Sequence, residues 1–187
     1  MSRPNHVPQT RAVVKSHSRC SCNFSGFESV LPEQIIIMCG ILVVHSKNNK
    51  LNFERCNSAL KRLSLRGPDY DFSSTYFNDS LYFGQTVLSI TGDPKKHIDT
   101  YHYSANNRYD ILLNGEIYNH LSIREELKKE NGFTGWKSTS DTETLLQAVE
   151  FWGIEKTLEK IIGMFAFAIW DKINNFLYLA RDRFGEK

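Results

Sequence analysis

The stretch at 165–170, Phe-Ala-Phe-Ala-Ile-Trp, limits the possible folds of this chain more than any other. Every position is apolar, and a second strand-like segment at 176–181 follows across the polar turn Lys172–Asn175. A strand that is apolar at consecutive positions is buried on both faces, because a strand with one wet face alternates. We therefore predict a hairpin over 164–181, in a sheet covered by helices on one side and by another layer on the other.

Composition excludes several classes of protein. The 187 residues are 41% hydrophobic and 24% charged, which is typical of a globular domain with a substantial core. The longest apolar run, 35–44, is about half the length of a membrane span, so we predict no membrane partner. Residues 1–38 hold four of the 23 basic and two of the 21 acidic residues, so the remainder is neutral. Because residues 39–187 carry no net charge, electrostatic attraction gives no reason to expect a nucleic-acid partner.

Periodicity and turn residues predict the other elements. Asn131-Gly132 is expected to end one helix, and either Ser140 or Asp141 to cap the next. For Asn114-Gly115, the common structural interpretation is the turn of a hairpin after a short strand. The predicted strands are 40–44, 72–77, 81–90 and 109–113, and the predicted helices are 53–65, 121–130, 140–152 and 154–161.

Residues 1–38 have no helical or strand period and are expected to be disordered. Three interpretations stay open: a targeting peptide, a propeptide, or upstream sequence joined by a start codon placed too early. We favour the last, because Met38 is itself a sensible start. Cys20 and Cys22 have C-x-C spacing and no second ligand pair, so no metal site is predicted. The two cysteines of the body do not form a disulfide framework, which favours the cytoplasm.

Met38-Cys39 suggests that this chain uses an N-terminal cysteine as a catalytic nucleophile. If translation starts at Met38 and the methionine is trimmed, Cys39 holds a thiol and a free α-amine in one residue. This pair supplies a nucleophile and its base, as in enzymes that use their own N-terminal amine. The competing interpretation is an inert cysteine buried in the apolar strand that follows.

Six short stretches, taken in order, resemble the glutaminase domain of class II (N-terminal nucleophile) glutamine amidotransferases, in the asparagine synthetase branch. The resemblance covers 38–187 and implies a type 2 glutamine amidotransferase domain over 39–187. It also implies an α+β fold, the four-layer αββα sandwich with two antiparallel sheets of the Ntn hydrolases. The stretches are Met-Cys-Gly-Ile at 38–41, Arg-Gly-Pro-Asp at 66–69, Asn-Gly-Glu-Ile-Tyr-Asn at 114–119, Ser-Asp-Thr-Glu at 140–143, Gly-Met-Phe-Ala-Phe-Ala at 163–168 and Arg-Asp-Arg-Phe-Gly at 181–185.

The resemblance implies a role for each site residue. Cys39 would attack the carboxamide of L-glutamine and form a thioester, with its own α-amine as proton acceptor and donor. The Asn114 side chain and the Gly115 N–H would hold the oxyanion. Glu116 and Asp141 would contact the amino-acid end of the substrate, although helix capping is the alternative role of Asp141. The stretch at 66–69 is expected to support the site rather than to contact substrate.

One position departs from the family pattern. Asparagine synthetases read Arg-Leu-Ser-Ile where this chain has Val87-Leu88-Ser89-Ile90, and that arginine grips the substrate α-carboxylate. Backbone groups of Leu88, Ser89 and Ile90 are expected to line the pocket. Three hypotheses remain: another cation replaces the arginine, glutamine binds weakly, or catalysis is lost. The candidate cations are Arg62, Lys95, Lys96 and His97.

The resemblance also implies a partner. Family members carry a synthetase domain that uses ATP and Mg²⁺, whereas the glutaminase half needs no metal or cofactor. No Ser-Gly-Gly-x-Asp-Ser phosphate loop occurs here, so this chain is expected to be a fragment that releases ammonia to a missing domain or subunit. A homodimer is possible by resemblance. The alternatives are amidation of an acceptor other than aspartate, and a catalytically silent module with a structural role.

Overall fold

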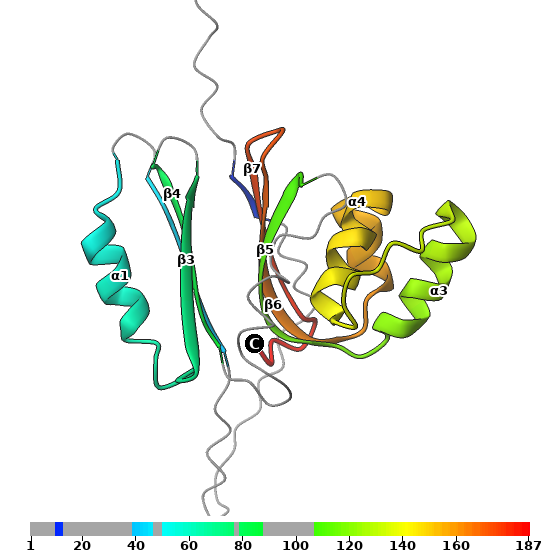
Figure 1. The fold of residues 1–187 in the computed structure, drawn as a ribbon, viewed down its shortest axis with the longest axis horizontal. Helices are drawn as coiled ribbons and strands as arrows, with labels where there is room; N and C mark the ends of the chain where they lie inside the picture. The colour runs from blue at the N-terminus through cyan, green and yellow to red at the C-terminus, as the bar shows by residue number, and fades with distance from the viewer. Residues whose placement is uncertain (1–9, 13–38, 47–49, 77–78, 88–106) are drawn as a thin grey trace, which may run out of the picture.

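Two β-sheets lie face to face with helices on both outer faces in the computed structural model (Figure 1). The structure describes residues 10–12, 39–46, 50–76, 79–87 and 107–187. From one side to the other, the layers are α1, a three-stranded sheet, a four-stranded sheet, and the helix pair α3 and α4. The predicted αββα sandwich is confirmed.

The three-stranded sheet has the order β2-β4-β3 and is antiparallel throughout. Its strands are β2 (Gly40–His45), β3 (Tyr70–Tyr76) and β4 (Leu81–Val87). The outer face is covered by α1 (Phe53–Lys61), whose first turn is capped by the Asn52 side chain at 3.0 Å from the Arg55 N–H. The helix is four residues shorter than predicted, because the chain turns before the Gly-Pro pair at 67–68.

The four-stranded sheet has the order β1-β7-β6-β5. The strands β5 (Tyr109–Ile117), β6 (Gly163–Asp171) and β7 (Phe176–Arg181) are antiparallel, so the predicted hairpin is confirmed. The short strand β1 (Thr10–Ala12) pairs in parallel with β7, in a segment where the sequence predicted no strand.

Two helices cover the outer face of this sheet. The first, α3 (His120–Asn131), ends at Gly132 with a φ of 66°, as predicted from the Asn-Gly pair. The second, α4 (Asp141–Lys160), is broken at Gly153, whose φ of 77° and ψ of 167° are not helical. This break separates the two helices predicted at 140–152 and 154–161.

The hairpin-turn interpretation of Asn114-Gly115 is wrong. Both residues lie inside β5, where Asn114 pairs with Ala166 and Gly115 pairs with Phe165. The long-range pairing with β6 therefore overrides the local preference of the dipeptide for a turn. Gly115 has a φ of 137°, and a Cβ there would overlap the carbonyl oxygen of Met164, so this position requires glycine.

Side-chain alternation decides which residues face the space between the sheets. The inter-sheet core contains Leu81, Phe83, Leu112, Ala168, Trp170 and Leu177, with Ile41 and Val43 packed against it. Successive side chains of a strand point to opposite faces. The odd-numbered positions of β2 and β4 and the even-numbered positions of β5 therefore face this space.

Candidate active site

Cys39 lies directly before β2 and is half-buried. Since Ile41 and Val43 pack between the sheets, alternation places the Cys39 side chain on the same inner face. Gly40 pairs with Thr86 in the antiparallel register, so extending that register by one residue sets Cys39 opposite Val87. Val87 is buried on this inner face, next to the predicted nucleophile.

Thr86 holds the start of β2 from the outer face of the sheet. Its Oγ1 accepts a hydrogen bond from the Gly40 N–H at 3.2 Å and donates one to the Leu63 carbonyl at 3.1 Å. A Cβ at Gly40 would lie 2.8 Å from this oxygen, so only glycine permits the approach. The residue after Cys39 is thereby fixed to β4.

The stretch at 66–69 supports this arrangement through its backbone. A Cβ at Gly67 would lie 2.5 Å from the backbone nitrogen of Val87, which shows how closely the turn packs on β4. The Asp69 N–H donates to the Val87 carbonyl at 3.2 Å.

Among the described residues β5 is the last strand of its sheet, and its outer edge carries backbone groups that β6 does not use. Phe165 donates its N–H to Asp182 and accepts from the Asp182 N–H, so both of its backbone groups point toward β7. Its partner Gly115 is therefore at a position without hydrogen bonds to β6, and the Gly115 N–H points toward the open edge. The backbone groups of Leu113 and Ile117 point to the same edge by the same alternation.

Side chains from other elements occupy two of these edge positions. The Gln85 side chain on β4 donates from Nε2 to the Leu113 carbonyl at 2.8 Å. The Asp141 side chain at the start of α4 accepts the Ile117 N–H on Oδ2 at 2.9 Å. Gly115 lies between these two contacts, and its N–H faces the same edge.

Asn114 and Glu116 project from β5 toward the inner side of the sandwich. Leu112 lies in the inter-sheet core and Leu113 packs against the helices, so alternation gives Asn114 and Glu116 the inner face. Asn114 is only 9% exposed, and its Oδ1 has no hydrogen-bond partner among the residues that the structure describes. Glu116 is exposed at the end of the strand.

Ser140, not Asp141, caps α4. The Ser140 hydroxyl accepts from the Thr142 N–H at 3.1 Å, which leaves the Asp141 carboxylate for β5. The start of α4 is held further by Glu143, which is buried and accepts the N–H groups of Lys137 and Ser138, both at 2.8 Å. The predicted stretches at 114–119 and 140–143 are joined by one direct hydrogen bond, from the Ile117 N–H to Asp141.

A cationic side chain, Arg124, also supports the segment before α4. Arg124 of α3 donates to the carbonyl oxygens of Ser138 and Ser140 at 2.8 and 2.7 Å, and lies over the Trp136 ring at 4.2 Å from its centroid. Burial lowers the pKa of Arg124, although the nearby Glu143 acts in the opposite direction. Periodicity did not single out Arg124, because it lies in a stretch that has the pattern of an ordinary helix surface, and Glu143 was named only as part of the stretch at 140–143 without a role.

The stretch at 181–185 is organised by one carboxylate. Asp182 is 4% exposed, and its two oxygens accept five backbone N–H groups. Burial raises the pKa of this carboxyl, but the backbone hydrogen bonds outweigh that effect and leave the pKa below its ordinary value. The five donors belong to Phe165, Phe184, Gly185, Glu186 and Lys187.

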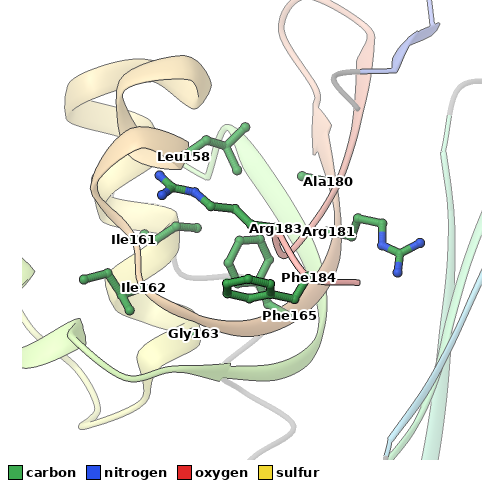
Figure 2. A pocket seen from close by; sticks show the side chains of 9 residues that line it. All are labelled: Leu158, Ile161, Ile162, Gly163, Phe165, Ala180, Arg181, Arg183 and Phe184. Atoms are coloured by element: carbon green, nitrogen blue, oxygen red, sulfur yellow. The ribbon is translucent and has the colours of Figure 1, made fainter. Parts of the chain in front are cut away.

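A pocket of about 200 Å³ opens on the helix side of the four-stranded sheet, beside the stretch at 181–185. In Figure 2 the Phe165 ring lies among the other lining side chains, and the Arg181 side chain points away from them. None of the predicted site residues lines this pocket. Its lining residues are Leu158, Ile161, Ile162, Gly163, Phe165, Ala180, Arg181, Arg183 and Phe184.

Some predicted residues lie outside the part of the chain that the structure describes. These are Leu88, Ser89 and Ile90, together with three of the four candidate cations. The fourth, Arg62, is the C-cap residue of α1 and is exposed. Within the described residues, no group of three or more His, Cys, Asp and Glu side chains is arranged to hold a metal.

The chain belongs to the glutamine amidotransferase domain family, whose pattern matches residues 38–187. Within this class, an asparagine synthetase (glutamine-hydrolysing) 1 of Bacillus subtilis is 38% identical over 160 residues, or 80% of this chain and 23% of the relative. An asparagine synthetase 3 of Arabidopsis thaliana is 34% identical over 150 residues, or 79% of this chain and 24% of the relative. A putative asparagine synthetase of Mycobacterium tuberculosis is 43% identical over 83 residues, or 44% of this chain and 12% of the relative.

This chain therefore spans about a quarter of the length of the Bacillus and Arabidopsis relatives. The family match and these relatives identify residues 38–187 as a glutamine amidotransferase domain. None of the helices in the described ranges is both long and apolar enough to cross a membrane.

Proposed function

We propose that the chain is the glutaminase half of an asparagine synthetase-like enzyme and converts L-glutamine and water into glutamate and ammonia through a cysteine thioester. The observation that supports it best is the position of Cys39 and of the edge of β5. Cys39 stands at the start of β2, and Gly115 turns its N–H to the edge of β5 that a β4 side chain reaches. These positions support the proposal that a nucleophile and its oxyanion donors meet at one end of the inter-sheet space.

In the first half-reaction, the Cys39 sulfur attacks the carboxamide carbon of glutamine. The Cys39 α-amine takes the thiol proton and passes it to the departing nitrogen, which leaves as ammonia. The negative oxygen of the tetrahedral intermediate is held by the Asn114 side-chain amide and the Gly115 N–H. Water then attacks the thioester, releases glutamate and restores the thiol.

Glu116 and Asp141 are proposed to recognise the amino-acid end of the substrate. Asp141 already accepts the Ile117 N–H on Oδ2 at 2.9 Å, which orients the carboxylate. Its Oδ1 accepts only a long contact of 3.5 Å from the Thr142 hydroxyl and is proposed to bind the substrate α-ammonium. Its position beside β5 makes this double role geometrically consistent. Backbone groups of Leu88, Ser89 and Ile90 are proposed to complete the pocket.

The ammonia is proposed to pass to a synthetase domain or subunit, which would require ATP and Mg²⁺. The glutaminase half uses only groups of this chain and requires no cofactor in this mechanism. The alternative function, a catalytically silent module, is favoured by one observation: Val87, with no hydrogen-bonding side chain, lies opposite Cys39.

The test starts with the N-terminus, since Cys39 in the 187-residue chain has an amide nitrogen and no basic amine. Intact mass and N-terminal sequencing of the protein from its host are expected to show a chain that begins at Cys39. That form is then assayed for glutamate release, beside Cys39→Ala and the 187-residue chain. We expect glutamine hydrolysis only in the form that begins at Cys39. Activity in Cys39→Ala would refute the mechanism, and a host protein that retains residues 1–38 would favour the silent module.

A further inference from the structure

Gln85 is a buried amide in the middle of an otherwise apolar contact between the two sheets. It is 1% exposed, and alternation along β4 directs it toward β5. Its Nε2 donates to the Leu113 carbonyl at 2.8 Å, while its Oε1 has no hydrogen-bond partner among the described residues. A buried amide with half of its polar atoms unpaired costs stability. A core built for stability alone would therefore carry an apolar side chain here.

The position of this contact suggests what the amide does. The Leu113 carbonyl directly precedes Asn114 and lies one edge position from the Gly115 N–H. On the other side of Gly115, the Ile117 N–H is held by Asp141 at 2.9 Å. The segment 113–117 contains both predicted oxyanion donors and is thus held at both ends. One of the two residues that hold it, Gln85, belongs to the opposite sheet.

The same strand also fixes the nucleophile. Thr86 adjoins Gln85 in sequence and holds the Gly40 N–H, one residue after Cys39. Because neighbouring side chains of a strand point to opposite faces, Gln85 reaches the oxyanion segment while Thr86 reaches the start of β2. The distance between nucleophile and oxyanion donors is therefore set by two successive residues of β4.

The geometry points to Gln85 as a positioning residue of the glutaminase reaction. Through its bond to Leu113 it holds the Asn114–Gly115 segment of one sheet at a fixed place relative to Cys39 on the other. It does not touch the reacting atoms. This inference rests on the proposed function, because the segment needs an exact place only if it stabilises an oxyanion. Misplacing reacting groups by about 1 Å can cost about a hundredfold in rate.

Gln85→Met tests the inference, since methionine has a similar length and no hydrogen-bonding amide. The matched control is Tyr76→Phe, which removes another polar group from the inter-sheet core. Tyr76 packs on that core at the opposite end of β4, where its hydroxyl interacts with Asp110. Both variants lose one inter-sheet polar contact, but only Gln85→Met loses the contact beside Asn114.

In the form that hydrolyses glutamine, kcat of Gln85→Met is expected to fall about tenfold to a hundredfold, because misplaced oxyanion donors lose transition-state stabilisation. KM is expected to stay within about threefold of the wild-type value, because the interaction is made only in the transition state. The alkylation rate of Cys39 by iodoacetamide, followed by mass spectrometry of its peptide, should not change, since alkylation needs no oxyanion donor. A kcat equal to that of Tyr76→Phe, or a matching loss of alkylation, would overturn the inference.

Hydrogen–deuterium exchange on the 187-residue chain supplies a readout that needs no activity. Exchange in a peptide covering 113–117 is expected to rise in Gln85→Met and to stay at the wild-type level in Tyr76→Phe. Equal exchange in the two variants would overturn the positioning role. If the wild type hydrolyses no glutamine in any form, the proposed function fails, whereas this exchange comparison still decides whether Gln85 holds the segment.

Discussion

Asp182→Asn offers a quantitative test of how the C-terminal stretch is held on the sheet. The substitution keeps the size of the side chain but replaces one carboxylate oxygen with an NH₂ group. If the amide oxygen takes the Oδ1 place, it keeps the contacts from Phe184, Gly185 and Glu186, and the contacts from Phe165 and Lys187 to Oδ2 are lost. A hydrogen bond to a charged acceptor contributes about 1.5–3 kcal/mol, and the Lys187 N–H can turn to water.

We therefore expect the free energy of unfolding to fall by about 2–3 kcal/mol, mainly through the buried Phe165 N–H. For a chain of this size, this loss lowers Tm by roughly 4–12 °C. Calorimetry and urea unfolding measure both quantities. Asp71→Asn is the control, because Asp71 is an exposed carboxylate on β3 and its loss should change stability by less than about 0.5 kcal/mol. Equal Tm values for the two variants would refute the reasoning.

Three further predictions follow from the fold and the site. Gly115→Ala should lower the free energy of unfolding by about 2–4 kcal/mol through backbone strain and overlap with β6. Gly132→Ala is the control, because Gly132 also has a positive φ but has open space around it, so its substitution should cost less stability. Equal urea midpoints for the two variants would exclude the overlap. Val87→Arg should lower KM for glutamine, since it places a guanidinium opposite Cys39; an unchanged KM would mean that another cation holds the carboxylate. Hydrogen bonds lower the pKa of Asp171 and Asp182 against the effect of burial, so the folded state favours the ionised forms. Their contribution is present above the ordinary carboxyl pKa and is lost as pH falls through the lowered values; urea midpoints that stay flat below pH 4 would contradict this.

Sequence patterns predicted most elements, because burial on both faces of β6 and the helix end at Gly132 are local signals. The four-layer αββα arrangement was implied by the family resemblance. Sequence patterns did not predict the conformation of Asn114-Gly115. The dipeptide favours a turn locally, and only its pairing with β6 keeps it extended. Asp141 was assigned two roles, and the structure separates them by giving the cap to Ser140.

Gln85 was missed although a signal for it exists. In β4 the run Leu81–Gly84 is apolar, and then two polar residues follow in a strand that is buried at every position. A buried amide needs a partner, so its presence in such a strand indicates a contact. The sequence does not reveal that this contact is the carbonyl of Leu113, since the two residues belong to different sheets.

In the part of the chain that the structure describes, β5 ends its sheet, and this edge affects how the protein avoids aggregation in a crowded cell. An unpaired edge strand offers a row of N–H and C=O groups to any other extended chain and so invites sheet-to-sheet aggregation. Here the amide of Gln85 covers the Leu113 carbonyl, and the carboxylate of Asp141 covers the Ile117 N–H. These side chains block the ladder that an intruding strand would need, while the single N–H of Gly115 still points to the edge. The same two contacts that shape the site thus protect the strand from misassembly.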